Sequence, residues 1–402
     1  MHILYVTHAY KPAYRVGGPI WSVSAAAEGL AARGHKVTVF TSNTNLDQIL
    51  DVPVNQPLMV DGVEVWYFSQ KKANTWIPRT KYFSQSIGFL VTPALRPAMM
   101  RLLPTVDVVH TQNPFVYPTI VAGRLAIKGN TPLFYSQRGV FHPSRLRFRA
   151  LKKRLFIELF EKPIMRGAAG LIALSPEEHD SFRALGVQTR CHIIPNGIDV
   201  GAFKTLPSEG FASSFGIRPS DQVILFLGRL HPIKGVDLLI DAFVRIASEH
   251  PMARLVVAGP DEFGFADKLR AEIAALNLSE RIILPGMVSG DAKLDLLARA
   301  DLFVLPSMGE GLSMAVLEAL ASATPVIISP ECNMQIVEDV GAGAVIVREP
   351  AQFAKAISDL LSDPLRLEAA RKSAYALARD HFGWSSIVDK LEAVYKSALI
   401  GT

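Results

Sequence analysis

The feature that most constrains the fold of this chain is an alternation of short β-branched segments with longer helical ones, which runs through the sequence twice. In the first half, strands are predicted at 3–7, 36–41, 63–68, 106–110, 133–136, 170–174 and 191–194. In the second half, they are predicted at 223–227, 255–258, 281–284, 302–305, 326–329 and 344–347. Strands that alternate with helices predict parallel, doubly wound sheets, so we expect an α/β protein with two such sheets.

The two halves meet at the turn Pro195-Asn196-Gly197-Ile198-Asp199, and a stretch rich in Gly, Ser and Pro follows at 207–219. A chain of 402 residues has room for two to three domains of about 150 residues. Ligands of open α/β sheets bind outside the carboxyl ends of the strands. If two such edges face each other across the linker, the cleft between the domains is a suitable place for a small-molecule site.

Several common ligand-binding motifs are absent from the sequence. It contains neither the dinucleotide fingerprint G-x-G-x-x-G nor a Walker A sequence, and no D-x-D pair to hold Mg²⁺ or Mn²⁺ on a diphosphate. No His, Cys and carboxylate cluster has metal-ligand spacing, and the two cysteines cannot form a disulfide scaffold. A diphosphate bound here must therefore be neutralised by basic side chains and a helix N-terminus.

Charge and hydropathy bear on the location of the protein. No apolar run approaches the ~18 residues needed to span a bilayer, and no basic segment precedes the first strand. We therefore expect a cytoplasmic protein without a signal peptide. Residues 1–199 hold 23 Lys and Arg against 12 Asp and Glu, whereas the remainder of the chain is acidic. This asymmetry predicts that only the first half faces an anionic partner.

Two basic residues follow the first strand of the second half, in the string Gly228-Arg229-x4-Lys234-Gly235. An Arg and a Lys on one short loop at the carboxyl end of a strand can converge on two phosphates. Taken alone, the pair is a weak indication, since two cations in a loop usually belong to a solvated surface.

A second string, at 305–319, combines a strand end, a Gly-containing turn and a helix that is predicted to start near Leu312. The N–H groups of Leu312, Ser313 and Met314 would point at an anion. Glu310 lies in the turn and Glu318 lies on the helix, and a carboxylate can accept paired hydrogen bonds from the vicinal hydroxyls of a ribose or a hexose. This arrangement favours a sugar nucleotide. The alternative makes Glu310 a helix-start carboxylate and Glu318 a solvated residue.

These motifs, in this order, resemble the signature of the retaining family 4 glycosyltransferases, whose fold is GT-B. The resemblance spans nearly the whole chain and rests on Glu310-x7-Glu318, Gly228-Arg229-x4-Lys234-Gly235, Pro195-Asn196-Gly197-Ile198-Asp199, Gly17-Gly18-Pro19 and Phe382-Gly383-Trp384. It implies two Rossmann-like domains that face each other across a cleft. The first would hold residues 1–197 and a C-terminal helix, 384–402, that crosses back, and the second, 198–383, would bind the nucleotide sugar.

The resemblance also implies a role for each site residue. Arg229 and Lys234 would bind the donor diphosphate together with the amides at Leu312, Ser313 and Met314, Glu310 would contact hydroxyls of the transferred sugar, Glu318 would hold the ribose, and Gly17 and Gly18 would let the first-domain loop approach the phosphate and the acceptor. The family retains the anomeric configuration. It needs no metal and no cofactor beyond the nucleotide sugar.

One position departs from the family pattern. After the strand 133–136 many relatives place a His, whereas the string here is Ser136-Gln137-Arg138-Gly139. An Arg cannot act as a base, but it can bind a sugar oxygen or a phosphate, so we assign Arg138 to donor binding. His110 ends a neighbouring strand, where it is either a sugar or acceptor contact or a structural strand-end residue.

The basic excess of the first half concentrates at Arg145, Arg147, Arg149, Lys152, Lys153 and Arg154, with apolar residues between them. Such a basic amphipathic stretch suits anionic headgroups, and relatives with lipid-linked acceptors dock through the first domain. We therefore expect a surface for the membrane or the acceptor, with peripheral attachment at the inner face of the cytoplasmic membrane. The alternative is a solvated helix face.

The sequence as a whole predicts a retaining, metal-independent hexosyltransferase that uses a UDP- or GDP-linked sugar. Its acceptor would be a glycan or a polyprenyl-linked glycan in bacterial-type polysaccharide assembly, such as that of an exopolysaccharide. One alternative is a nucleotide-sugar epimerase on the same fold, for which Asp107 is the only carboxylate near a strand end of the first domain. Another is a non-catalytic sugar-nucleotide-binding protein. Nucleic acid is not expected as a partner, because no supporting motif occurs.

Overall fold

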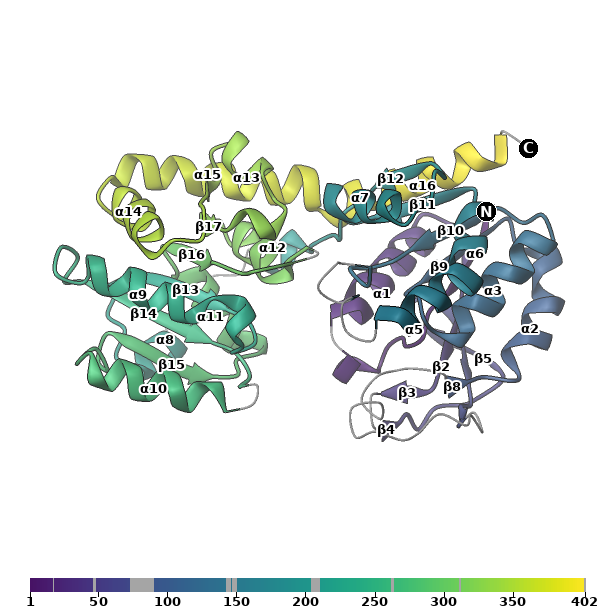
Figure 1. Ribbon diagram of the computed structural model, residues 1–402, viewed down its shortest axis with the longest axis horizontal. Coiled ribbons are helices and arrows are strands. Elements are labelled where there is room, and N and C mark those ends of the chain that lie inside the picture. The colour runs from purple at the N-terminus through teal and green to yellow at the C-terminus, as the bar shows by residue number, and fades with distance from the viewer. Residues whose placement is uncertain are drawn as a thin grey trace. The chain divides into compact units, whose positions relative to one another are not determined.

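The computed structural model describes residues 1–16, 18–45, 48–72, 90–141, 146, 150–203, 210–261, 264–310 and 312–400 of the chain. The chain divides into two compact units. Unit 1 comprises Met1–Gly197 and Trp384–Thr402, and unit 2 comprises Ile198–Gly383. Each unit contains a sheet with helices packed against it (Figure 1).

The sheet of unit 1 consists of β1 (His2–Val6), β2 (Lys36–Ser42), β5 (Pro57–Val60), β6 (Val63–Phe68), β9 (Val108–Gln112), β10 (Leu133–Ser136), β11 (Gly170–Ala173) and β12 (Cys191–Ile193). Their order in space is β12-β11-β10-β9-β1-β2-β6-β5. β5 runs antiparallel to β6, and the other neighbours pair in parallel. β1, β9 and β10 are buried at every position, as expected of strands covered on both faces.

Two sets of helices cover the faces of this sheet. One face carries α1 (Gly18–Ala32) and α16 (Trp384–Ile400), which pack against Ile3 and Tyr5. The other carries α2 (Leu95–Leu102), α3 (Tyr117–Lys128), α6 (Lys162–Gly167) and α7 (Pro176–Ala184), which pack against Leu4 and Val6. Alternate side chains of β1 thus point to opposite faces, as in any strand. α5 (Ala150–Phe156) precedes a π-helical turn at Ile157–Glu161 and then α6.

α16 joins unit 1 from the far end of the chain. Its apolar stripe is buried there: Ile387, Leu391 and Tyr395 lie in the core beside β1 and α1. The Tyr395 hydroxyl also lies 3.0 Å from the Tyr5 hydroxyl, within hydrogen-bond distance. Burying an apolar side chain of this size is worth about 1.5–3 kcal/mol, so α16 contributes substantially to the stability of unit 1.

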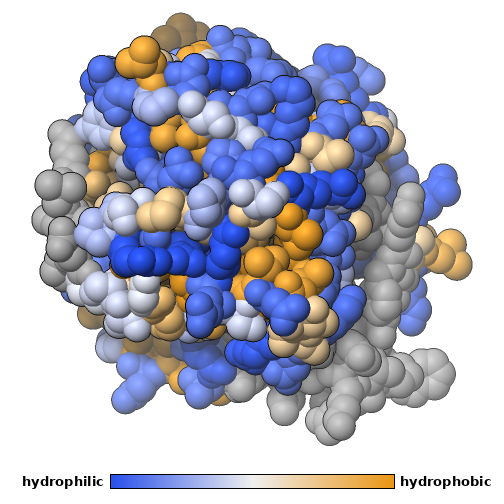
Figure 2. Space-filling view, turned by 90° about the vertical axis from the view of Figure 1, so that its left-hand side faces the viewer, coloured by the Kyte–Doolittle hydropathy of each residue, from blue (hydrophilic) through white to orange (hydrophobic). Residues whose placement is uncertain are grey.

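The sheet of unit 2 is parallel throughout and has the order β15-β14-β13-β16-β17-β18. Its strands are β13 (Gln222–Leu227), β14 (Ala253–Ala258), β15 (Ile282–Gly286), β16 (Leu302–Leu305), β17 (Val326–Ile328) and β18 (Gly343–Val345). Its helices are α8 (Gly210–Ser214), α9 (Val236–Ile246), α10 (Phe265–Ala275), α11 (Gly290–Arg299), α12 (Met314–Ala321), α13 (Ile336–Asp339), α14 (Pro350–Leu361) and α15 (Pro364–Phe382). Figure 2 faces unit 2 and shows mostly hydrophilic residues around smaller hydrophobic areas.

The prediction of doubly wound parallel sheets is confirmed in both units. The sequence patterns missed β5, an edge strand that starts at Pro57 and alternates between exposed and half-buried side chains. They also missed two short antiparallel pairs, β3 (Thr44–Asn45) with β4 (Gln48–Ile49) and β7 (Lys71–Lys72) with β8 (Leu90–Val91). Pairs of two residues carry too little periodicity to be recognised. Within the described residues, every helix is too short or too polar to cross a membrane.

Candidate functional site

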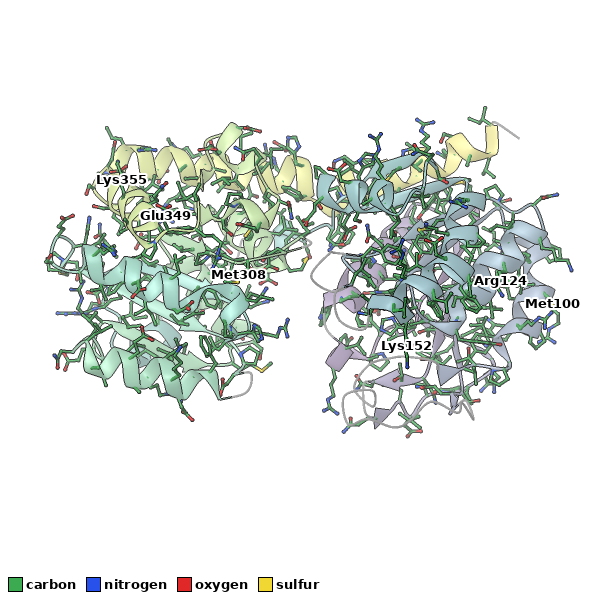
Figure 3. The ribbon with its side chains drawn as sticks, viewed as in Figure 1. Met100, Arg124, Lys152, Met308, Glu349 and Lys355 are labelled. Carbon is green, nitrogen blue, oxygen red and sulfur yellow. The ribbon has the colours of Figure 1, made fainter. Side chains whose placement is uncertain are left out.

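The loops that follow β13 and β16 lie together at the carboxyl edge of the unit 2 sheet. The backbone N–H of Met308 donates to the carbonyl of Ile233 at 2.7 Å, and Ser307 Oγ donates to the same oxygen at 3.2 Å. Between these loops only glycine fits at position 235, because its φ is +71° and a Cβ would lie 2.2 Å from the carbonyl oxygen of Pro306. These contacts therefore fix the positions of the two loops relative to each other. Figure 3 labels Met308 in the second of them.

An ion pair joins these two loops. The Lys234 ammonium, at the end of the 3-10 turn Pro232–Lys234, donates to the Glu310 carboxylate. The backbone of Glu310 is held as well: its N–H donates to the carbonyl of Glu331 at 2.9 Å, and its carbonyl accepts from Asn333 Nδ2 at 3.0 Å. The side chains of Lys234 and Glu310 are only 15% and 11% exposed, so solvent screens this pair less than a surface pair. Two of the residues that the sequence singled out are thus brought together.

The helix of the Glu310–Glu318 motif begins two residues later than predicted. α12 starts at Met314, and Ser313 precedes it with extended dihedral angles (φ −78°, ψ 115°), as is usual at an N-cap. Leu312 and Ser313 therefore belong to the turn. Ser313 does not use its hydroxyl to cap the helix, so the first amides of α12 stay available to an anion at this edge.

Glu318 is the fifth residue of α12. It contacts a lysine that the sequence analysis did not single out. Lys293 Nζ, on α11, is 2.8 Å from Glu318 Oε1, and the two side chains are 30% and 18% exposed. No local pattern could reveal this contact, because it joins two helices separated by a strand. Arg229 lies exposed immediately after Gly228, at the end of β13.

Unit 1 contains a pocket at the carboxyl edge of its own sheet. Its empty space, part of which is open to solvent, is about 300 Å³, and its lining includes His110, Ser136, Arg138, Asn196 and Trp384. Arg138 Nε donates to Gln112 Oε1 at 2.6 Å, while Nη1 donates to Ser22 Oγ at 3.0 Å and to Asn196 Oδ1 at 2.8 Å. Asn196, in the turn where the two halves of the sequence meet, thus contacts a residue of the candidate site. The sequence analysis did not name Gln112. Its place in the polar end of the otherwise apolar, buried strand β9 (Val-Val-His-Thr-Gln) could have indicated it.

His110 is built into the interior of unit 1. Its Nδ1 lies 2.6 Å from the Tyr395 hydroxyl, its Nε2 lies 2.8 Å from Ser136 Oγ, and the residue is 1% exposed. Burial, and to a lesser degree the charge of Arg138, holds the pKa of His110 well below its usual value. The imidazole is therefore neutral at pH 7. Because both ring nitrogens have partners, this geometry favours the structural of the two roles considered for His110.

The remaining residues of interest are distributed over unit 1. Gly18 begins α1, whereas Gly17, Arg145, Arg147 and Arg149 lie outside the described residues. The other members of the basic stretch, Lys152, Lys153 and Arg154, lie on α5, where Leu151 and Leu155 are 82% and 59% exposed. The Lys152 side chain can be followed in Figure 3. Asp107 precedes β9, at the amino edge of the sheet, and its Oδ2 accepts from the backbone N–H of His2 at 2.6 Å.

Comparisons with protein families match both units. A family model described as glycosyl transferases group 1 matches residues 209–377, and one described as a glycosyl transferase 4-like domain matches residues 17–197. D-inositol 3-phosphate glycosyltransferase 1 of Catenulispora acidiphila is 32% identical over 252 residues, which make up 60% of this chain and 60% of that protein. The chain thus spans about three fifths of the length of this curated relative.

Solved structures resemble the chain over nearly its whole length. The sucrose-phosphate synthase of Thermosynechococcus elongatus aligns with a TM-score of 0.73 at 20% identity and covers 100% of both chains. Anabaena Alr3699/HepE in complex with UDP and glucose aligns with a TM-score of 0.71 at 20% identity, over 98% of this chain and 99% of that one. At such identities the likeness is one of fold.

Proposed function

Because the chain belongs to the group 1 glycosyltransferases of the family 4 type, with the GT-B fold, we propose that it transfers a hexose from a UDP- or GDP-linked sugar to a glycan or lipid-linked acceptor. The observation that carries this proposal is the Lys234–Glu310 ion pair beside the first amides of α12. The UDP and glucose in the HepE structure support a nucleotide sugar as the donor.

In the proposed reaction, unit 2 stabilises the leaving diphosphate. Negative charge grows on the β-phosphate as the bond to the anomeric carbon breaks. Lys234, Arg229 and the amides at the start of α12 are the groups proposed to meet that charge, as preorganised dipoles and cations. Binding the diphosphate would draw the Lys234 ammonium from Glu310 to the phosphate, because a phosphate offers more negative charge than one carboxylate.

The carboxylates of Glu310 and Glu318 are proposed to bind hydroxyl groups of the donor. Glu310, once released from Lys234, would accept hydrogen bonds from the transferred sugar, and Glu318 would accept them from the ribose. Lys293 would keep the Glu318 carboxylate oriented, because its ammonium lies 2.8 Å from Glu318 Oε1. A retaining course, in which the leaving phosphate takes the acceptor proton, and independence of metal ions are part of the same proposal.

The other two candidate functions have less support. An epimerase would need a carboxylate at the ligand-binding edge of unit 1, and Asp107 lies at the opposite, amino edge with its carboxylate bonded to the backbone of His2. Product analysis with donor alone would reveal an epimer if this reasoning is wrong. A non-catalytic sensor would bind the donor but leave it intact, so a donor-hydrolysis assay separates it from an enzyme.

The acceptor is proposed to meet unit 1, with α5 as the surface for an anionic membrane. The support is the cluster of Lys152, Lys153 and Arg154 next to the exposed Leu151 and Leu155, which combines cations with apolar side chains. Co-sedimentation with vesicles that contain phosphatidylglycerol tests this point. If the protein binds phosphatidylcholine vesicles equally well, the basic side chains of α5 form a solvated helix face instead.

The donor is tested most directly by ligand-induced stabilisation. A panel of UDP- and GDP-linked hexoses is added to the protein, and the melting temperature is recorded. A ligand present at 100 times its Kd stabilises the folded state by about 2.7 kcal/mol, so one base and one sugar should stand out. The absence of stabilisation by any member of the panel, together with the absence of turnover, would overturn the proposed function.

A further inference from the structure

Arg138 is held in an unusual backbone conformation at the end of β10. Its φ is +49°, in the left-handed region, and Gly139 follows with a φ of +74°. A residue with a side chain adopts this region at an energetic cost, so the surrounding structure must hold it there. Apart from the part that is open to solvent, the pocket beside Arg138 has room for about one water molecule, and most of its lining is buried. A ligand of more than a few atoms therefore finds no space inside it.

The guanidinium of Arg138 joins three separate segments of unit 1. Nε donates to Gln112 Oε1 on β9 at 2.6 Å, and Nη1 donates to Ser22 Oγ on α1 at 3.0 Å. Nη1 also donates to Asn196 Oδ1, in the segment that follows β12, at 2.8 Å. Because the fork of a guanidinium is planar and rigid, these bonds fix the three acceptors relative to one another.

The charge of Arg138 strengthens these bonds. Burial lowers the pKa of Arg138, whereas Tyr5 and Glu178 raise it electrostatically. A guanidinium stays protonated in proteins, so Arg138 carries its positive charge at pH 7. Hydrogen bonds from a charged donor are shorter and stronger than those between neutral groups. The three acceptors are therefore held more firmly than neutral bonds would hold them.

From Gln112 the hydrogen-bond network continues to α16. Because Arg138 donates to Gln112 Oε1, the amide nitrogen of Gln112 faces the His110 ring, 3.1 Å from His110 Nε2. His110 Nδ1 lies 2.6 Å from the Tyr395 hydroxyl, which itself lies 3.0 Å from the Tyr5 hydroxyl. Gln112, His110 and Tyr395 are buried. A buried polar group that loses its partner is costly, so these side chains keep their positions as one unit.

The two ends of this network lie beside the two places where the chain passes between the units. Unit 1 ends at Gly197 and resumes at Trp384, and we call these places the crossings. Asn196 directly precedes the first crossing, and α16, the helix of Tyr395, begins at the second. The Trp384 ring also lies against Gly197, where a Cβ would come within 2.4 Å of it. Both crossings are thus tied to the sheet of unit 1.

We propose that Arg138 is a positioning residue that fixes both crossings on unit 1, the first through Asn196 and the second through the network that ends at Tyr395. The inference rests on the proposed function, in which unit 2 holds the donor and unit 1 meets the acceptor. Transfer then depends on how the chain between the units is anchored, whereas binding of the donor nucleotide by unit 2 does not. This role differs from the donor contact that the sequence predicts for Arg138.

Kinetic and binding measurements on variants of the full chain test the proposal. Arg138→Gln should lower kcat about tenfold or more, because a small displacement of reacting groups is costly even when the changed residue is remote. Its Kd for UDP, measured by calorimetric titration, should equal that of the unmodified protein. Arg138→Lys should recover part of kcat, since an ammonium can still donate to one or two of the acceptors. Arg96→Gln, exposed on α2, is the matched control and should change neither quantity.

A second variant removes only one acceptor and keeps the test valid if Arg138→Gln does not fold. Asn196→Ala should lower kcat a few fold and leave the Kd for UDP unchanged. If Arg138 acts through Asn196, the double variant should lose little more activity than Arg138→Gln alone, whereas independent contacts would have multiplicative effects. Hydrogen exchange gives a further readout: the amides of α16 should exchange at least tenfold faster in Arg138→Gln, and those of α12 should not.

Three results would overturn the proposal. They are an unchanged kcat in both single variants, multiplicative effects in the double variant, and a weaker UDP affinity in Arg138→Gln, which would assign Arg138 to the donor as the sequence predicts. Failure of the unmodified protein to bind UDP would contradict the proposed function instead. The two failures are therefore distinguishable.

Discussion

The carboxyl edges of the two sheets hold their charges in different ways. In unit 2 each carboxylate of the Glu310–Glu318 motif has its own lysine, Lys234 for the first and Lys293 for the second. In unit 1 a single arginine, Arg138, is held by three neutral side chains. Both edges are polar, and among the described residues the motif carboxylates of unit 2 form ion pairs, whereas Arg138 forms none.

This difference indicates how each edge can respond to a ligand. A lysine that is paired with a carboxylate can exchange that partner for a phosphate, which leaves the carboxylate available to a hydroxyl group. An arginine held by neutral oxygens has no such partner to exchange. The first arrangement suits a donor that arrives and leaves as a diphosphate.

The largest expected effect tests a further contrast, that only unit 1 needs a distant segment of the chain. Deleting Trp384–Thr402 removes four core residues, Ile387, Val388, Leu391 and Tyr395, and uncovers one face of the sheet. We expect insoluble protein or a chain without cooperative unfolding of unit 1, measured by thermal denaturation. A soluble truncated chain with full transfer activity would contradict this account.

The next effect tests whether the unit 2 pairs serve the leaving group. Lys234→Ala should lower kcat on the order of 10²-fold while the fold persists, because a preorganised cation is lost. Steady-state kinetics and circular dichroism measure the two parts of this statement. Lys355→Ala, on the exposed face of α14 (Figure 3), serves as the control and should behave as the unmodified protein. Near-normal turnover in Lys234→Ala would contradict the proposal that Lys234 binds the leaving diphosphate.

Glu318→Ala should act on binding rather than on chemistry. A ribose contact is made equally in the ground state and in the transition state, so the donor KM should rise about tenfold with little change in kcat. Glu368→Ala, on α15, removes an exposed carboxylate and provides the comparison. A fall in kcat at constant KM would assign Glu318 to the reacting sugar instead.

A smaller effect is expected at Lys293, which contacts Glu318 but is not proposed to contact the donor. Lys293→Met should raise the donor KM a few fold, and Lys293→Arg should restore it, because the cation that orients the carboxylate returns. An unchanged KM would make the pair structural.

The last prediction is that removal of metal ions has no effect on activity. If Lys234, Arg229 and the α12 amides neutralise the diphosphate, treatment with EDTA should leave the transfer rate unchanged. Loss of activity that Mg²⁺ or Mn²⁺ restores would show that a cation from solution shares this task.

The features that sequence reasoning recovered are those with local signals. Strand and helix periodicity predicted both parallel sheets, and β10 and β16 were predicted at their observed bounds. The start of α12 was misplaced because the apolar Leu312 continues the helical pattern, whereas Ser313 has extended dihedral angles and the helix begins after it. Edge strand β5 lacked a buried face and was therefore missed.

The contacts of the candidate site could be predicted only in part, for a related reason. Lys234 and Glu310 could be named from their motifs, but their ion pair is a tertiary contact across 76 residues. Lys293 has no motif at all, and the neutral partners of Arg138 come from three elements that only the folded sheet brings together. Contacts of this kind join residues far apart in the chain, so no local periodicity of the sequence predicts them.

The hydrogen bond between Tyr5 and Tyr395 also has a consequence for biosynthesis. The two residues are 390 positions apart, and a ribosome that adds about 5–20 residues per second needs roughly 20–80 seconds to travel between them. All of unit 2 emerges during that interval, while β1 and α1 wait for the helix that covers them. Unit 1 is therefore begun first and completed last, and during translation the apolar side chains that α16 covers stay exposed until that helix is made.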